Sequence, residues 1–148
     1  MDYNSVDILL VEDDFNDAEL TMRELKKNHL ANHMFHVKNG EEAINFIFAL
    51  NEYAHTRKID QSPKVILLDI NMPKVNGIEV LEKLKSDPRT KEIPVVILTS
   101  SREGPDIQKC YQLGANSYIA KPVNFEAFRR AIKDIGFYWL LLNQPPGK

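Results

Sequence analysis

The chain has 148 residues, 43% of them hydrophobic, so it is long enough to bury one core and too short for two ordinary domains. Its 19 basic and 21 acidic side chains leave a net charge of −2, which provides no basic field for binding nucleic-acid phosphates. It has one cysteine, no pattern of a secretory signal and no apolar run as long as a membrane span. We therefore expect one soluble, cytoplasmic domain over residues 1–148, without a direct nucleic-acid or membrane partner.

Five short segments have the composition of β-strands. The continuous apolar run 8–11 is typical of a strand that is covered on both faces, and the alternation at 35–37 fits a more edge-like strand. Three further strands are expected at 65–68, 95–98 and 118–120. A helical pattern follows each of them, so strands and helices alternate along the chain.

Apolar residues at helical spacing indicate five helices, each with one buried face. These groups are Ala18 to Leu25, Ala43 to Leu50, Val80 to Leu84, Ile107 to Leu113 and Phe128 to Ile135. Gly114 is expected to end the fourth helix, and Asn124 to cap the fifth. Strict alternation of strands and helices predicts one parallel sheet with right-handed crossovers, in which all strands end at the same edge.

Polar residues stand at the ends of four predicted strands. Asp13 follows the first strand, Asp69 the third and Lys121 the fifth, while Thr99 ends the fourth. Each has a simple structural explanation: an acid at a helix N-terminus, a turn carboxylate, a solvated charge and a β-branched strand residue. Ligands of open α/β sheets bind at this edge, however, and the four side chains complement one another chemically. We expect them to form one site.

The chemistry of these side chains favours phosphoryl transfer. Carboxylates about 4 Å apart repel by roughly 4 kcal/mol at an effective dielectric constant near 20, so Asp13 and Asp69 need a shared cation. Oxygen ligands select a hard ion, and a site with few protein ligands suits Mg²⁺ better than Ca²⁺. Lys121 can neutralise phosphate oxygens, and the Thr99 hydroxyl can donate a hydrogen bond to another. Asp69 remains as the nucleophile.

Four segments of the chain resemble the signature of the receiver domains of response regulators, which act in two-component systems. They are residues 10–14, 68–73, 98–101 and 118–122, and in order and spacing they span almost the whole chain. Each is a weak signal alone, but together they are specific. The resemblance implies an α/β, flavodoxin-like fold: a doubly wound, five-stranded parallel sheet in the order 2-1-3-4-5 with five helices.

The same resemblance implies roles for the site residues. Asp69 would accept a phosphoryl group from a sensor histidine kinase, and it would hold Mg²⁺ together with Asp13 and the main-chain carbonyl of Asn71. Glu12 would assist the ion through water, and Lys121 would neutralise the bound phosphoryl group. The chain would catalyse its own phosphorylation and slow dephosphorylation, but would serve mainly as a signalling switch.

Thr99 and Tyr118 are the switch residues that the resemblance implies. Thr99 would move toward the phosphoryl group, which would let Tyr118 change rotamer and alter a protein-binding surface. Phosphorylation would then shift a population of conformations that already exists. An ordinary half-buried strand aromatic is the alternative for Tyr118.

Two segments give a narrower resemblance, to single-domain regulators that partner bacterial phytochrome histidine kinases. They are the polar connection 51–63 and the ending 137–140. The connection is longer than most, and it is either functional or a tolerated surface insertion. A phytochrome kinase is therefore the partner that this likeness implies.

The C-terminal apolar run exceeds what a last helical turn needs to cover a core. We expect a domain core over about 5–136 and an apolar extension over 137–148. An exposed apolar patch tends to mark an interface, so we hypothesise a homodimer through Phe137, Trp139 and Leu140. A tail folded back onto its own domain is the alternative.

Two other classes of protein are alternatives for a fold of this kind. A phosphatase of the haloacid-dehalogenase type also uses an aspartate nucleophile with Mg²⁺, but it carries a second aspartate two positions on, where this chain has Asn71. A flavodoxin-like cofactor-binding module would need a phosphate-binding loop after the first strand, where this chain has three acids. Both remain less favoured hypotheses.

Overall fold

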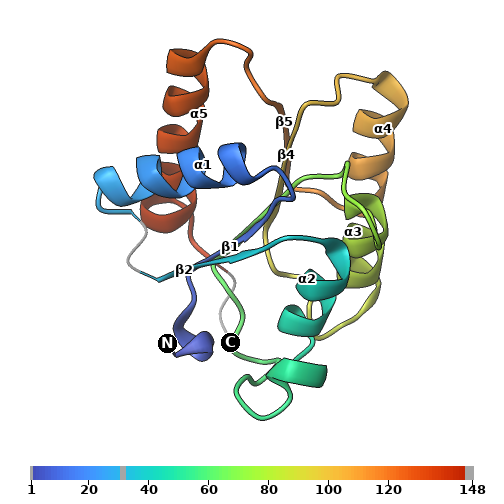
Figure 1. Cartoon of the computed structure of the whole chain (residues 1–148). Helices are drawn as coiled ribbons and strands as arrows, with labels where there is room; N and C mark the ends of the chain where they lie inside the picture. The colour runs from blue at the N-terminus through green and yellow to red at the C-terminus, as the bar shows by residue number, and fades with distance from the viewer. Residues whose placement is uncertain (1, 31–32, 146–148) are drawn as a thin grey trace.

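A computed structural model describes residues 2–30 and 33–145, in which one parallel sheet lies between two layers of helices (Figure 1). The sheet has the strand order β2-β1-β3-β4-β5. Its strands are β1 (Ile8–Val11), β2 (Met34–Val37), β3 (Val65–Leu68), β4 (Val95–Thr99) and β5 (Ser117–Ala120). The predicted flavodoxin-like fold and its strand order are confirmed. Among the described residues, no helix is long and apolar enough to cross a membrane.

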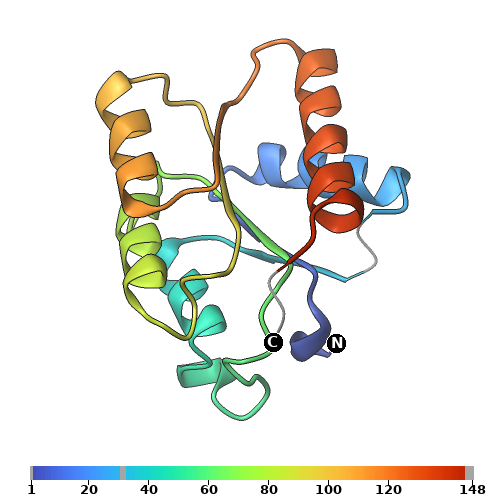
Figure 2. The ribbon, with the colours of Figure 1, turned by 180° about the vertical axis from the view of Figure 1, so that it is seen from behind.

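The helices divide between the two faces of the sheet. One face is covered by α1 (Phe15–Lys27) and α5 (Phe125–Phe137), and the other by α2 (Gly40–Ile47), α3 (Gly77–Ser86) and α4 (Gly104–Leu113) (Figures 1 and 2). Short 3-10 helices lie at Tyr3–Ser5 and Asn51–Tyr53, and a π-helical turn at Tyr138–Leu142 follows α5. The two-sided cover places the hydrophobic core in two layers, one on each face.

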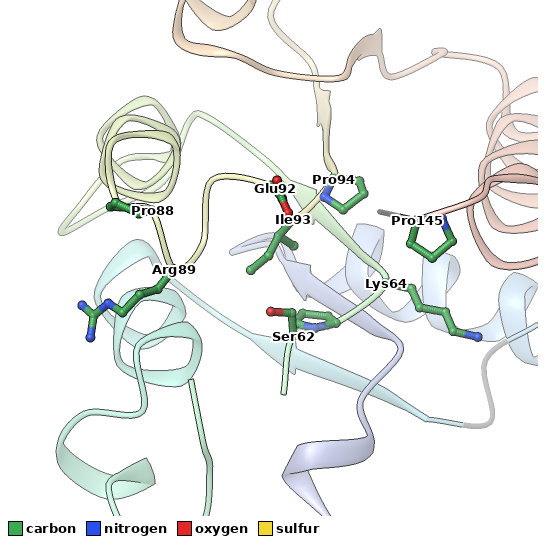
Figure 3. A pocket seen from close by; sticks show the side chains of 9 residues that line it. Ser62, Lys64, Pro88, Arg89, Glu92, Ile93, Pro94 and Pro145 are labelled. Carbon is green, nitrogen blue, oxygen red and sulfur yellow. The ribbon is translucent and has the colours of Figure 1, made fainter. Parts of the chain in front are cut away.

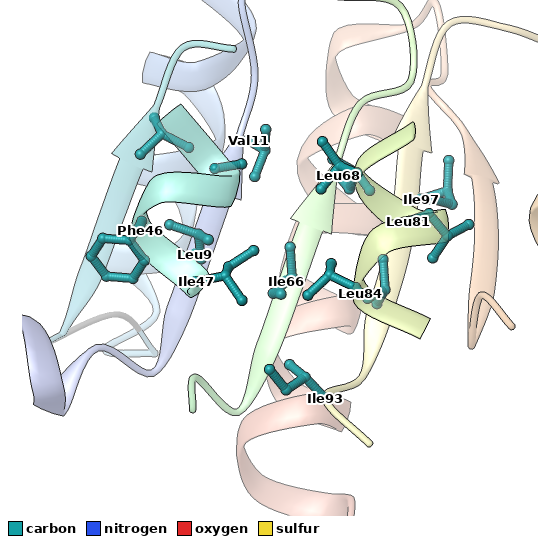
Figure 4. Close-up of a cluster of buried hydrophobic side chains, with 14 of the residues drawn as sticks. Leu9, Val11, Phe46, Ile47, Ile66, Leu68, Leu81, Leu84, Ile93 and Ile97 are labelled. Carbon is teal, nitrogen blue, oxygen red and sulfur yellow. The ribbon is translucent and has the colours of Figure 1, made fainter. Parts of the chain in front are cut away.

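The central strands are buried on both faces because side chains alternate along a strand. In β1, Leu9 and Val11 belong to the cluster under α2, α3 and α4, while Ile8 and Leu10 belong to the cluster under α1 and α5. Figure 4 shows the first cluster, in which side chains of the sheet meet those of α2 and α3. Burial on two faces explains why these strands are continuous apolar runs.

Asparagine and glycine set several helix ends. Asn39, Asn76 and Asn124 each accept a hydrogen bond from a main-chain amide in the first turn of the helix they precede. Gly114 ends α4 with φ +106°, a left-handed conformation that glycine adopts without strain. The predicted roles of Asn124 and Gly114 are confirmed.

The prediction for Leu50 was wrong. Its spacing places it on the buried face of the second helix, but α2 ends at Ile47 and the Leu50 side chain is 43% exposed. Ala49 and Asn51 adopt positive φ angles of 54° and 52°, so the chain leaves the helical path on both sides of Leu50. The helical spacing of apolar residues in the sequence therefore continues past the end of the helix.

The connection after α2 is ordered around one buried cation. Arg57 is 4% exposed, and its guanidinium donates hydrogen bonds to the main-chain carbonyls of Phe46, Tyr3 and Gln61. The same group lies 4.2 Å from the centroid of the Phe46 ring. Arg57 thus ties this connection to the end of α2 and to the N-terminal segment.

The C-terminal apolar run divides into two parts. Trp139 and Leu140 pack against the core cluster under α1 and α5, as the alternative of a tail folded onto its own domain expected. Phe137 and Leu141 are 47% and 57% exposed. Of the three residues predicted for a homodimer interface, only Phe137 is therefore exposed. The last three residues of the predicted extension lie outside the described part of the chain.

Candidate functional site

The carboxyl edge of the sheet brings together the acids that the sequence predicts there. Glu12 and Asp13 directly follow β1 and Asp69 directly follows β3, its neighbour in the sheet. One carboxylate oxygen of each of these three residues lies within 4.8 Å of those of the other two. Glu12 and Asp69 are buried, whereas Asp13 is exposed. In this acidic pocket, two of the three acids are therefore buried and the third faces solvent.

The two carboxylate oxygens of Asp69 have different surroundings. Oδ1 accepts a hydrogen bond of 2.7 Å from the Thr99 hydroxyl and one of 3.1 Å from the main-chain amide of Asn71. The only hydrogen bond that Oδ2 accepts within the described chain is a long one, 3.5 Å, from the Lys121 ammonium. Since Oδ1 already accepts two shorter hydrogen bonds, Oδ2 is the oxygen with fewer close donors and the better candidate for a bond to an incoming group.

Lys121 is surrounded by carboxylates. Its ammonium lies 2.5 Å from Glu12 Oε1 and 2.9 Å from Asp17 Oδ2, both closer than Asp69. Sequence reasoning missed Asp17. A signal for it does exist: Asp17 lies in the first turn of the helix that follows β1, and that turn begins at the same edge of the sheet as the pocket.

The crowding of these groups shifts their pKa values. Burial, followed by the nearby Asp69 carboxylate, raises the pKa of Glu12 to about 8, although Lys121 opposes the change. Burial lowers the pKa of Lys121, but hydrogen bonds to Glu12 and Asp17 outweigh it, so the pKa lies above its ordinary value. The pocket thus holds more acids than it can keep ionised cheaply without a further cation.

The donor set of the pocket fits a hard divalent ion. Its acids supply only oxygen ligands, and Asp13 remains exposed where an ion would keep part of its water. Few protein ligands and a partly hydrated ion are the features that favour Mg²⁺. The main-chain carbonyl of Asn71, predicted as a further ligand, belongs to the turn that follows Asp69, and its role stays a prediction.

Gly77 fixes the position of the Asp69 backbone. A Cβ atom at Gly77 would lie 2.2 Å from the Asp69 carbonyl oxygen and 2.5 Å from the Ile70 Cα, closer than real contacts allow. The Gly77 amide also donates a 3.1 Å hydrogen bond to the Ile70 carbonyl. The start of α3 can therefore pack directly beneath the loop that carries Asp69.

The predicted switch residues are linked through the loop after β4. Thr99 bonds to Asp69, and the Tyr118 hydroxyl donates a 3.0 Å hydrogen bond to the Ser101 carbonyl, two residues beyond Thr99. The Ser101 hydroxyl in turn donates to Asp106 at the start of α4. Tyr118 is half-buried, and burial raises the pKa of its hydroxyl. A change at Asp69 has a continuous path to α4.

A cavity of about 280 Å³ lies away from this pocket. Figure 3 shows its lining, which comes from the segment before β3, the connection between α3 and β4, and Pro145. Three more prolines of the lining flank strands or helix ends: Pro63, Pro88 and Pro94. None of the predicted site residues lines this cavity.

Comparisons with known proteins point to one family. The model of the response regulator receiver domain matches residues 8–133. A probable methanogenesis regulatory protein, FilR2 of Methanothrix harundinacea, is 36% identical over 140 residues, which cover 95% of this chain and 87% of that protein.

Two solved structures extend the likeness to the whole fold. The Mn²⁺-bound form of Rcp1, a response regulator of Synechocystis sp., has a TM-score of 0.87 at 34% identity, covering 95% of this chain and 98% of that one. The phosphorylated cyanobacterial phytochrome response regulator RcpA has a TM-score of 0.87 at 37% identity, covering 95% and 97%. These neighbours carry a divalent ion in one case and a phosphoryl group in the other.

Proposed function

Because this chain belongs to the family of response regulator receiver domains, we propose that Asp69 is the carboxylate that receives its phosphoryl group. The chain is a signalling switch that accepts phosphate from a histidine kinase, and its acidic pocket binds Mg²⁺. The observation that supports Asp69 is the unequal environment of its two oxygens. Oδ2 forms the new bond to phosphorus, the bond from phosphorus to the kinase histidine nitrogen breaks, and the nitrogen keeps the electron pair.

The neighbours of Asp69 prepare it for this step. Thr99 and the main-chain amide of Asn71 hold Oδ1, which fixes the carboxylate plane and leaves Oδ2 with its long contact to Lys121. Lys121 lies on the Oδ2 side, where its charge neutralises phosphoryl oxygens. Phosphoryl transfer needs mainly alignment and charge neutralisation, and these residues contribute both.

Glu12, Asp13 and Asp69 are the acids that we propose for holding Mg²⁺, with Glu12 acting through water. When bound, the ion supplies positive charge that offsets the acids and the phosphoryl oxygens. Thr99 and Tyr118 then transmit the new state through Ser101 to the start of α4. That surface is our proposed site of output.

Incubation with acetyl phosphate and Mg²⁺, followed by intact mass measurement, tests the assignment of Asp69. We expect one added phosphate on the wild type and on Asp134→Ala, an exposed acid of α5, and none on Asp69→Ala. Chelation of Mg²⁺ should prevent the addition. Phosphate retained on Asp69→Ala would refute the assignment.

We infer that the cognate kinase is a bacterial phytochrome. The support is the likeness to RcpA, which is itself a phytochrome response regulator. A purified phytochrome kinase should transfer phosphate to this chain at least about 10-fold faster than a kinase without a photoreceptor, as expected for cognate recognition. Equal rates would count against it.

We also propose a homodimer, with the exposed part of the C-terminal run as its interface. Phe137, Leu141 and Leu142 expose about half of their surface each, at 47%, 57% and 56%. Sedimentation velocity should show that Leu141→Arg is a monomer and that Leu50→Arg, at an exposed leucine outside the C-terminal run, sediments as the wild type does. A monomeric wild type would exclude the dimer. The domain limits, the absence of nucleic acid as a partner and the cytoplasmic location stay predictions.

A further inference from the structure

Asp17 has a contact that the phosphorylation chemistry does not require. An ammonium group has three N–H donors, and those of Lys121 face three carboxylates. The distances are 2.5 Å to Glu12, 2.9 Å to Asp17 and 3.5 Å to Asp69. Two acids therefore hold the cation more closely than the phosphoacceptor does.

Asp17 differs from Glu12 in its position. Glu12 is buried and belongs to the group of three acids whose oxygens lie within 4.8 Å of one another. Asp17 is outside that group, its side chain is 35% exposed, and its carboxylate bonds to Lys121 at the mouth of the pocket. Asp17 thus bonds to the lysine and lies outside the group of acids that could coordinate the ion.

Two physical effects of this carboxylate oppose phosphorylation. A phosphoryl oxygen on Asp69 must draw toward itself an ammonium group that Asp17 holds at 2.9 Å, closer than Asp69 does at 3.5 Å. The Asp17 charge also repels the negative charge of a phosphoryl group that approaches Asp69. The same negative charge attracts a divalent cation, so its effect on the ion has the opposite sign.

We propose that Asp17 is a positioning residue that restrains Lys121 in the unphosphorylated state, which weakens phosphoryl binding and strengthens cation binding. This inference rests on Asp69 as the phosphoacceptor. The backbone of Asp17 is fixed within α1, because its amide donates to the Asp14 side chain and its carbonyl accepts from Thr21. The carboxylate is therefore presented to Lys121 from a rigid support.

The variant Asp17→Asn tests the proposal because it removes the charge and keeps the size. Glu19→Gln is the matched control: it removes an acid two residues along the same helix, where Glu19 pairs with exposed Arg23. Beryllofluoride, a phosphoryl mimic, is titrated at saturating Mg²⁺ and followed by ¹⁹F NMR. Mn²⁺ affinity is measured separately by electron paramagnetic resonance, without any phosphoryl donor.

We expect Asp17→Asn to bind beryllofluoride about 2- to 5-fold more tightly and Mn²⁺ about 2- to 5-fold more weakly, as a partly exposed charge allows. Glu19→Gln should leave both affinities at the wild-type values. A purely structural role would weaken both ligands together, and that result, or unchanged beryllofluoride affinity, would overturn the proposal. Asp17→Ser provides the same comparison if Asp17→Asn does not fold. Failure of the Asp69 assignment is recognised separately, by a phosphate that persists on Asp69→Ala.

Discussion

Two buried cations at opposite edges of the sheet show how the same kind of group can serve function or structure. Lys121, at the carboxyl edge, is 9% exposed and faces three side-chain carboxylates. Arg57, near the end of α2, is 4% exposed and donates to three main-chain carbonyls. Burial lowers the pKa of Arg57, whereas the carboxylates more than reverse that effect at Lys121.

The difference lies in whether the partners can be exchanged. Main-chain carbonyls are fixed by the fold, so Arg57 has one arrangement and closes a loop. Carboxylate partners belong to side chains and are negatively charged, and a phosphoryl group with the same sign of charge can replace one of them. The cavity beside Pro63 and Pro94 is lined by neither cation (Figure 3). The candidate functional site is therefore recognised by its charged side chains and not by the size of a cavity.

The largest effect is expected at Lys121. Lys121→Met should slow phosphorylation by acetyl phosphate by about 100-fold, because one preorganised donor to a developing charge is commonly worth that much. The time course of the mass increase measures the rate in saturating Mg²⁺. Unchanged kinetics would mean that Lys121 is a structural cation like Arg57, and would remove the contrast between them.

Arg57→Met should affect stability and not phosphorylation, in contrast to Lys121→Met. Three carbonyls would lose their donor, so the free energy of unfolding should fall by about 2–3 kcal/mol, while the folded protein keeps its phosphorylation rate within about twofold. Urea unfolding measures the first quantity. Lys58→Met, at the exposed neighbour, is the control and should leave stability unchanged. A large loss of phosphorylation rate in folded Arg57→Met would show that the two edges are coupled.

The sequence predicts one of these cations and not the other, for a physical reason. Lys121 follows a strand, and parallel strands deliver their last residues to a common edge, so alternation alone predicts that it lies at the same edge of the sheet as Asp69. Arg57 lies in a polar connection without periodicity, and its burial depends on carbonyls far along the chain. The place of Asp17 in the first turn after β1 could have been read from the sequence, but its contact with Lys121 depends on how α1 lies against the pocket.

Backbone conformation also limits how much of the fold can be predicted from the sequence. The sheet order came from a resemblance, since alternation permits several doubly wound orders. Leu50 was placed in a helix because its spacing is helical. The positive φ angle at Ala49 has no sequence signal, and the one at Asn51 has only a weak signal, because asparagine tolerates this conformation better than most residues. The separation of Trp139 and Leu140 from exposed Leu141 likewise depends on a π-helical turn that periodicity does not predict.

A third cation tests whether a carboxylate partner is enough for a phosphoryl group to replace that partner. Arg129 on α5 donates a 2.6 Å hydrogen bond to Glu24 on α1, whose side chain is 7% exposed. The hydrogen bond from Arg129, with a further one from Asn28, lowers the pKa of Glu24 despite its burial. Within residues 2–30 and 33–145, the ion pairs of Arg129 join it to Glu24 and Glu126 and to no acid of the pocket, so we expect the Arg129–Glu24 pair to be structural.

The smallest effect is therefore expected at Glu24. Since its pKa is lower in the folded state than in the unfolded state, the carboxylate stabilises the fold above its unfolded pKa, and this contribution is lost as pH falls through the folded pKa. Glu24→Gln should lower the free energy of unfolding by about 1 kcal/mol at pH 7, and the difference should shrink in acid, where wild-type Glu24 is also neutral. Urea unfolding at both pH values measures it, with Glu19→Gln as the exposed control. A stability difference between wild type and Glu24→Gln that persists in acid would assign the effect to packing. A changed phosphorylation rate would show that Arg129, like Lys121, takes part in phosphorylation.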